Sequence, residues 1–202
     1  MGLSENSPVG LDVPHATDMP ELSIVVPAFN EQDNVERLHD ELVEVLATLD
    51  ISWEVIFCDD GSSDDTWRNI ETLHASDPRI KGVRLSRNFG HQYALLAALT
   101  HSQGRAVISM DADLQHPPEV IPKLIEQWRK GARIVHTMRR DPETLSLFKR
   151  VTSKLYYRLF SYLSGVAIES GMADFRMLDR RVLDEILHFP EAGIFLRGIV
   201  QW

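Results

Sequence analysis

Cysteine is almost absent from this sequence, since Cys58 is the single one among 202 residues. One cysteine cannot form a disulfide within the chain, so a hydrophobic core must hold the fold, and the composition fits a reducing compartment. Hydrophobic residues make up 44% of the chain, which is enough for one good core at this length. Cys58 lies inside an apolar run and is predicted to be a small buried hydrophobic side chain.

Long hydrophobic runs are also missing. No segment approaches the roughly 18 apolar residues of a membrane span, and the N-terminus lacks the basic and apolar regions of a signal peptide. We therefore expect that the chain as given does not cross a bilayer. Residues 1–20 contain three prolines and no periodicity, which predicts a mobile tail. The folded domain is expected to span residues 21–202.

Basic residues are scarce in the first part of the chain. Residues 1–75 hold 17 acids and 2 bases, whereas residues 76–202 hold 13 acids and 19 bases. An anionic ligand or a membrane surface would be met by the second part, although solvated helix faces account for most of the individual charges. Glycine-rich phosphate loops of the GxGxxG and GxxxxGK[ST] types are missing, which argues against a classical dinucleotide site and a P-loop. Nucleic acid is not an expected partner.

What the sequence does contain is an alternation of short β-branched runs with amphipathic segments. Strands are predicted over residues 22–26, 53–58, 80–85, 106–110 and 133–138, with helices between them. Asn30 is the predicted N-cap of the first helix. This alternation predicts an α/β fold with a mostly parallel central sheet and helices on both faces.

The most informative stretch follows the strand predicted over residues 106–110. Asp111 and Asp113 come where that strand must end, and Gln115 adds an oxygen at the next alternate position. Ligands bind at the carboxyl ends of strands in open α/β sheets, and two carboxylates there suit a divalent cation on a diphosphate. One alternative is that the two acids cap the helix beginning near Pro118. Another is a haloacid-dehalogenase-type phosphotransferase, whose pattern has Thr or Val in place of Gln115.

Two other polar loops follow predicted strands, over residues 27–31 and 59–62. If the strands are parallel neighbours, these loops and the acids after residue 110 converge on one crevice, which is the expected nucleotide site. An acid at the end of the second strand can bond a base or ribose edge there.

Five segments carry a resemblance to a known family. In this order and spacing, IVVPAFNE, VIFCDDGSSDDT, RNFGHQ, MDADLQHPPE and DFRMLDRRV resemble a family 2 glycosyltransferase with the GT-A fold, which has a Rossmann-like nucleotide-binding half. More narrowly, they resemble the polyprenyl-phosphate glycosyltransferases, the group of dolichyl-phosphate mannose synthases and bactoprenol glucosyltransferases. The likeness covers residues 22–202. Members of the family continue past the segment matched by residues 195–202, so the domain is expected to be truncated at its C-terminal end.

The resemblance implies roles for individual residues. The donor, a nucleotide sugar, would be bound by Pro27, Phe29, Glu31, Asp60, Asp111, Ala112, Asp113 and Arg139. Magnesium or manganese would be held by Asp111, Asp113 and Gln115. The catalytic candidates are Asp174, Arg176 and Arg139. Asp174 either orients the acceptor or sugar or is a structural partner of Arg176. Positive charge for two meeting anions would come from Arg139, Arg140, Arg176 and Arg197, each of which is alternatively a solvated surface charge.

The function that the resemblance implies is inverting transfer of a glucose-like hexose from a UDP-linked sugar to a polyprenyl phosphate at the cytoplasmic face of the cell membrane. A phosphate monoester has a second pKa of about 6, so such an acceptor needs no strong general base. Other hypotheses are a family 2 transferase with another sugar or acceptor and a non-catalytic nucleotide-sugar-binding module. A homo-oligomer is left open.

Residues 144–165 favour a membrane surface as a further partner. Their apolar residues repeat at helical spacing beside Arg150, Lys154 and Arg158, and aromatic residues are interspersed. A basic, aromatic amphipathic helix suits the membrane interface, where the protein would be peripheral. Packing of the same apolar stripe on the core of the domain is the alternative.

Overall fold

The computed structural model describes residues 19–138 and 172–189, apart from the side chains of residues 172–174. The strands are β1 (Leu22–Ala28), β2 (Trp53–Asp59), β3 (Ile80–Arg84), β4 (Ala106–Ser109), β5 (Ile134–Met138) and β6 (Met172–Asp179). The helices are α1 (Val35–Ala47), α2 (Thr66–Ser76), α3 (His91–His101), α4 (Ile121–Arg129) and α6 (Arg180–His188), with a 3₁₀ turn η1 (Pro118–Val120) before α4. Each strand and helix predicted from the sequence over the described ranges is present, within a few residues at each end.

Within the described residues, six strands form one sheet in the order β3-β2-β1-β4-β6-β5. β1 pairs in parallel with β2 and β4, and β2 pairs in parallel with β3. β6 runs antiparallel to both of its neighbours, β4 and β5. Five of these six strands therefore point the same way, and the predicted mostly parallel sheet is confirmed.

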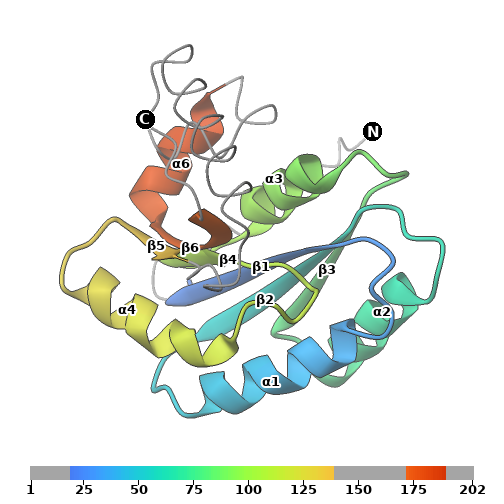
Figure 1. The fold of residues 1–202 in the computed structure, drawn as a ribbon, viewed down its shortest axis with the longest axis horizontal. Coiled ribbons are helices and arrows are strands. Elements are labelled where there is room, and N and C mark those ends of the chain that lie inside the picture. Colours follow the sequence, from blue (N-terminus) through green and yellow to red (C-terminus); the bar gives the residue numbers. More distant parts are fainter. Residues whose placement is uncertain (1–18, 139–171, 190–202) are drawn as a thin grey trace, which may run out of the picture.

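Helices cover both faces of the sheet, as Figure 1 shows, with α1, α2 and α4 on one side and α3 and α6 on the other. Leu42, Ile70 and Leu124 belong to the buried cluster on the first side. Leu95 and Leu183 belong to the cluster on the second side. All seven residues of β1 are buried, as expected of a central strand covered on both faces. This sandwich gives the loops at the strand ends a rigid support.

The sequence did not predict β6 or α6. β6 does not read as a buried strand because Arg176 interrupts its apolar residues, yet this arginine is only 3% exposed. Its Cα lies opposite Ser109 of β4 and His136 of β5. Because this charged residue interrupts the apolar pattern, the sequence does not predict a strand here. Only the folded structure shows it.

The predicted N-cap role of Asn30 is wrong, because α1 begins at Val35. Asn30 instead has a left-handed backbone, with φ of 56°, and its side-chain oxygen accepts the Ser63 N–H at 3.0 Å. Asn is among the few side chains that tolerate this conformation readily. The short polar side chain is therefore used to join two loops rather than to start a helix.

Candidate functional site

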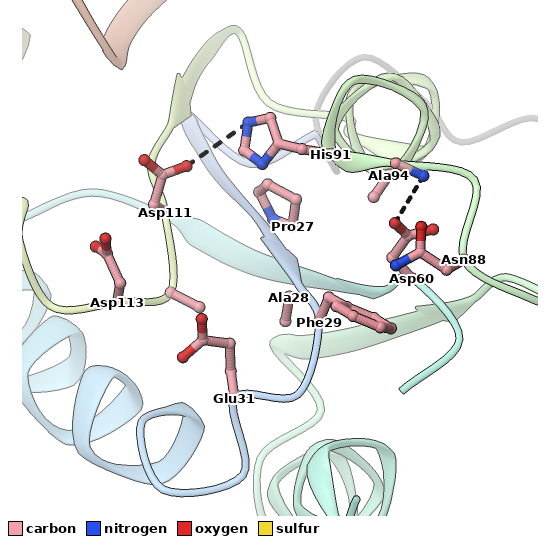
Figure 2. Close-up of a pocket in the computed structure, with 12 residues that line it drawn as sticks. Pro27, Ala28, Phe29, Glu31, Asp60, Asn88, His91, Ala94, Asp111 and Asp113 are labelled. Carbon is pink, nitrogen blue, oxygen red and sulfur yellow. Dashed lines mark hydrogen bonds and ion pairs between the residues drawn. The ribbon is translucent and has the colours of Figure 1, made fainter. Parts of the chain in front are cut away.

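A pocket of about 530 Å³ opens at the carboxyl ends of β1, β2 and β4 (Figure 2). It is lined by Pro27, Ala28, Phe29, Glu31, Asp60, Asn88, Gly90, His91, Ala94, Asp111, Ala112 and Asp113. These residues come from the ends of three parallel strands and from the start of α3. The predicted convergence of strand-end loops at one crevice agrees with this geometry.

The loop after β1 and the loop after β2 hold each other through reciprocal hydrogen bonds. The Asn30 N–H donates to the Ser62 hydroxyl at 2.9 Å, and the Glu31 N–H donates to the Thr66 hydroxyl at 2.8 Å. Asp64 accepts the Gln32 N–H at 3.3 Å across the same junction. Burial acts to raise the pKa of Asp64, but hydrogen bonds from Thr66 and Gln32 outweigh it and lower the pKa. This side of the pocket is thus fixed before any ligand enters.

Asp60 ties the loop after β2 to the start of α3. Its carboxylate accepts the backbone N–H groups of Phe89 at 2.8 Å and Gly90 at 2.9 Å, and its side chain is almost fully buried. Gly61 beside it has φ of 69°, and a Cβ there would lie 2.5 Å from the carbonyl carbon of Arg87. Asp60 lines the pocket as predicted, but its two oxygens also perform a structural task that the sequence did not indicate.

The opposite wall is formed by the segment after β4, which we call the acid loop (residues 111–116). Oδ1 of Asp111 lies 3.7 Å from Nε2 of His91, and Figure 2 shows this carboxylate directed toward the start of α3. Asp113 accepts the Gln115 N–H at 3.0 Å. Leu114 between them has φ of 59°, a conformation that costs a non-glycine residue about 1–2 kcal/mol. Such strain is found where a loop holds functional groups.

The alternative that these acids cap the following helix is wrong. The cap positions of η1 and α4 are occupied by Pro117 and Val120, and neither element has a side-chain cap hydrogen bond. Asp111 and Asp113 both line the pocket instead. Their carboxylates therefore face a ligand site and do not cap a helix.

The donor set of the acid loop fits a divalent cation bound together with a phosphate ligand. In residues 19–138 and 175–189, no group of three or more His, Cys, Asp and Glu side chains is arranged to hold a metal ion. Magnesium commonly binds through one or two carboxylates plus waters and substrate phosphates, so Asp111 and Asp113 suffice for that mode. Gln115 is exposed and does not line the pocket.

The predicted site residues divide into four groups, one of which is the exposed Gln115. The pocket brings together Pro27, Phe29, Glu31, Asp60, Asp111, Ala112 and Asp113. Arg176 is buried on β6, next to β4. The other predicted residues and segments lie outside the described residues: Arg139, Arg140, Arg197, the side chain of Asp174, the helix predicted over 144–165, the segment 195–202 and nearly all of the 1–20 tail.

Sequence reasoning missed the contribution of the segment before α3. Asn88, Gly90 and His91 line the pocket, and Ala94 follows one turn later. The signal was present, since RNFGHQ follows a predicted strand as the three other polar loops do. His91 could have been placed at the pocket by the same argument.

Cys58 is buried in the sheet, as predicted. Burial, with the nearby carboxylates of Asp60 and Asp59, raises the pKa of its thiol to about 12. A thiol in this state is protonated at neutral pH and is a poor nucleophile. The cysteine therefore packs in the core on the α3 side of the sheet, as a small hydrophobic side chain.

None of the helices within the described ranges is long and apolar enough to span a membrane.

Comparison with known proteins identifies the family. Residues 23–187 match the family described as glycosyl transferase family 2. An uncharacterized glycosyltransferase of Synechocystis sp. is 42% identical over 182 residues, covering 90% of this chain and 57% of that protein. A bactoprenol glucosyl transferase of Shigella phage SfX is 40% identical over 181 residues, covering 90% of this chain and 59% of that protein. The chain thus spans little more than half the length of these relatives.

Solved structures support the fold. A mannosyltransferase from Pyrobaculum calidifontis, solved with GDP-Man and Mn²⁺, has a TM-score of 0.57 at 20% identity, covering 93% of this chain and 52% of its own. A glucosyl-3-phosphoglycerate synthase from Mycobacterium tuberculosis, solved with Mn²⁺ and UDP, has a TM-score of 0.55 at 23% identity, covering 81% and 58%. These likenesses confirm the predicted GT-A fold. The match over residues 23–187 establishes that this chain belongs to glycosyl transferase family 2.

Proposed function

We propose that this chain transfers a hexose, most simply glucose, from a UDP-linked sugar to a polyprenyl phosphate at the cytoplasmic face of a cell membrane. The observation that carries the proposal is the pocket, which joins the aromatic ring of Phe29 to the two carboxylates of the acid loop. Its volume of about 530 Å³ falls in the range of small-molecule sites. The names of bactoprenol glucosyl transferase relatives, at 39% to 40% identity, support the choice of acceptor.

The donor would lie across the pocket, from the loop after β1 to the acid loop. Pro27, Phe29 and Asp60 lie on one side and would contact the base and ribose. Asp111 and Asp113 lie on the other side and would hold the diphosphate through magnesium or manganese. When bound, the cation would offset charge on the departing nucleoside diphosphate.

The proposed reaction is a single displacement. A phosphate oxygen of the acceptor attacks C1 of the sugar, the bond from C1 to the diphosphate oxygen breaks, and the electron pair leaves with the nucleoside diphosphate. One displacement inverts the configuration at C1. The acceptor phosphate is mostly dianionic near pH 7, because its second pKa is about 6, so no residue has to remove a proton. Arg176 and Arg139 are proposed to offset the charge of the two anions, and Asp174 is proposed to orient the acceptor or sugar.

The test is transfer of radiolabel from a panel of nucleotide sugars to undecaprenyl phosphate, alongside calorimetry of UDP binding with and without manganese. We expect UDP-glucose to label the lipid and manganese to strengthen UDP binding. Labelling from another nucleotide sugar would replace the donor. Binding of UDP without transfer to any acceptor would favour a nucleotide-sugar-binding module, and absence of binding would refute the proposal.

A membrane surface is the proposed partner of residues 144–165. If this segment lies in the interface, the protein should sediment with anionic liposomes at low salt. Changing Arg150, Lys154 and Arg158 to Glu should release it, because each basic residue at an anionic surface contributes about 1 kcal/mol. Sedimentation that depends on neither salt nor these three residues would favour packing on the core instead.

A further inference from the structure

His116 is the last residue of the acid loop, and its buried side chain is hydrogen-bonded to the first residue of that loop. The hydrogen-bonded ladder between β1 and β4 ends where the Met110 N–H donates to the Val25 carbonyl at 3.1 Å. The next N–H, that of Asp111, donates to Nδ1 of His116 at 3.1 Å. In this bond Nδ1 is the acceptor, and the same nitrogen lies 3.7 Å from Oδ2 of the Asp111 carboxylate. The start of the acid loop is thus fixed by a side chain from its own end.

The ring of His116 is itself fixed by packing. It is 4% exposed and stacks on Phe175 of β6, with ring centroids 5.2 Å apart and planes at 23°. Phe175 is 2% exposed and belongs to the core cluster between the sheet and α1. The imidazole therefore joins the acid loop to the strand that carries Arg176.

The loop needs such a support because its backbone adopts a conformation of high energy at one residue. Leu114 has φ of 59°, and the turn around it is closed by the Gln115 N–H bond to Asp113. A left-handed leucine persists only where surrounding contacts hold it. The His116 bond holds the entry to the loop, while the Gln115 bond holds its middle.

We propose that His116 is a positioning residue that presets the carboxylates of Asp111 and Asp113 for the metal-bound diphosphate. It does not line the pocket, so it acts through Asp111, whose N–H and whose carboxylate both lie against Nδ1, and not by touching the ligand. The inference rests on the proposed function, since it concerns how that site is held. A purely structural histidine would affect the fold, whereas a positioning residue affects how much manganese strengthens UDP binding.

The test compares two substitutions of His116, one that keeps an aromatic ring and one that keeps a hydrogen-bond acceptor. His116→Phe keeps a ring to stack on Phe175 but leaves the half-buried Asp111 N–H without this acceptor. His116→Asn loses the ring but places a side-chain oxygen near the former position of Nδ1. Calorimetry would measure the dissociation constant of UDP with and without manganese in each variant. Thermal unfolding would be followed in parallel.

We expect the gain in UDP affinity from manganese to fall about tenfold in His116→Phe, since a half-buried donor without this acceptor disfavours the preset loop. His116→Asn should retain most of the gain. UDP binding without manganese should change less than about twofold in both, because the base and ribose wall is held by other bonds. Should His116→Phe not fold, His116→Gln, whose amide reaches one bond beyond Nδ1, takes its place with the same expectation.

Four outcomes separate the hypotheses. If manganese does not strengthen UDP binding by the unchanged protein, the metal-assisted site of the proposed function fails. If it does so equally in the protein and in His116→Phe, or if His116→Asn loses the gain as fully as His116→Phe, the positioning role of Nδ1 is overturned. Weakening of UDP binding to the same degree with and without manganese also overturns it, because that result marks a general structural role.

Discussion

Two carboxylates, one at each end of the sheet, have opposite roles. At the amino ends of the strands, Glu54 is 3% exposed and accepts hydrogen bonds from Ser23 at 2.6 Å, Gln103 at 2.7 Å and Lys81 at 2.6 Å. At the carboxyl ends, Asp113 lines an open pocket and accepts the Gln115 N–H of its own loop. The first carboxylate is committed to the fold and the second faces a ligand site. Residue type alone does not distinguish them.

The strongest test of this contrast removes the buried acid. Glu54→Ala should lower the free energy of unfolding by about 3 kcal/mol, because the Ser23 hydroxyl and the Gln103 N–H lose their acceptor in a buried place. Urea denaturation measures the loss. Glu126→Ala is the control, since its pair with Lys130 is exposed and should leave the midpoint unchanged. An equal response of the two variants would show that the Glu54 network does not stabilise the fold.

The next largest effect is expected at the glycine that supports the pocket. Gly61→Ala should cost about 2 kcal/mol, since the new Cβ meets the Arg87 backbone at 2.5 Å and the residue has φ of 69°. Gly131→Ala is a matched control, because its φ is also positive, at 103°, but nothing lies within 4 Å of its Cβ. That variant should lose about 1 kcal/mol. Denaturant midpoints that fall equally would mean that backbone conformation and not crowding sets the cost.

A smaller effect is expected at Asp64, a carboxylate at the pocket end that is used for structure. Hydrogen bonds lower its pKa in the folded state, so its stabilisation is complete above the unfolded pKa of about 3.9 and is lost as the pH falls further. Asp64→Asn should therefore cost about 1 kcal/mol at pH 7 and less at pH 3. Unfolding at both pH values measures this. A difference that grows on acidification would contradict the assigned direction.

The smallest effect on stability is expected where the effect on ligand binding is greatest. Asp113→Ala should change the free energy of unfolding by about 0.5 kcal/mol, since one loop hydrogen bond is lost. It should nevertheless abolish the manganese-dependent part of UDP binding. Asp50→Ala removes an exposed carboxylate that does not line the pocket and should alter neither property. Retention of the manganese effect in Asp113→Ala would break the comparison between the two ends.

Much of the pocket could be anticipated from local sequence. Short β-branched runs predict the parallel strands, and polar residues directly after such runs must meet at one edge of the sheet. For this reason Phe29, Asp60, Asp111 and Asp113 could be placed at one site before any coordinates. The end of a strand can be predicted from local sequence. Parallel pairing of the strands then brings the residues that follow their ends close together.

What the sequence alone determined was the family, the α/β alternation and most of the pocket wall, because these depend on patterns within a few residues. Tertiary structure decided the rest. It inserted β6 antiparallel beside β4, although Arg176 hides that strand, and it gave Asp60 the N–H groups of Phe89 and Gly90. It also separated Glu54 from Asp113. The physical reason is that a carboxylate takes its role from partners that are distant in sequence, and only the packed fold brings those partners within hydrogen-bonding distance.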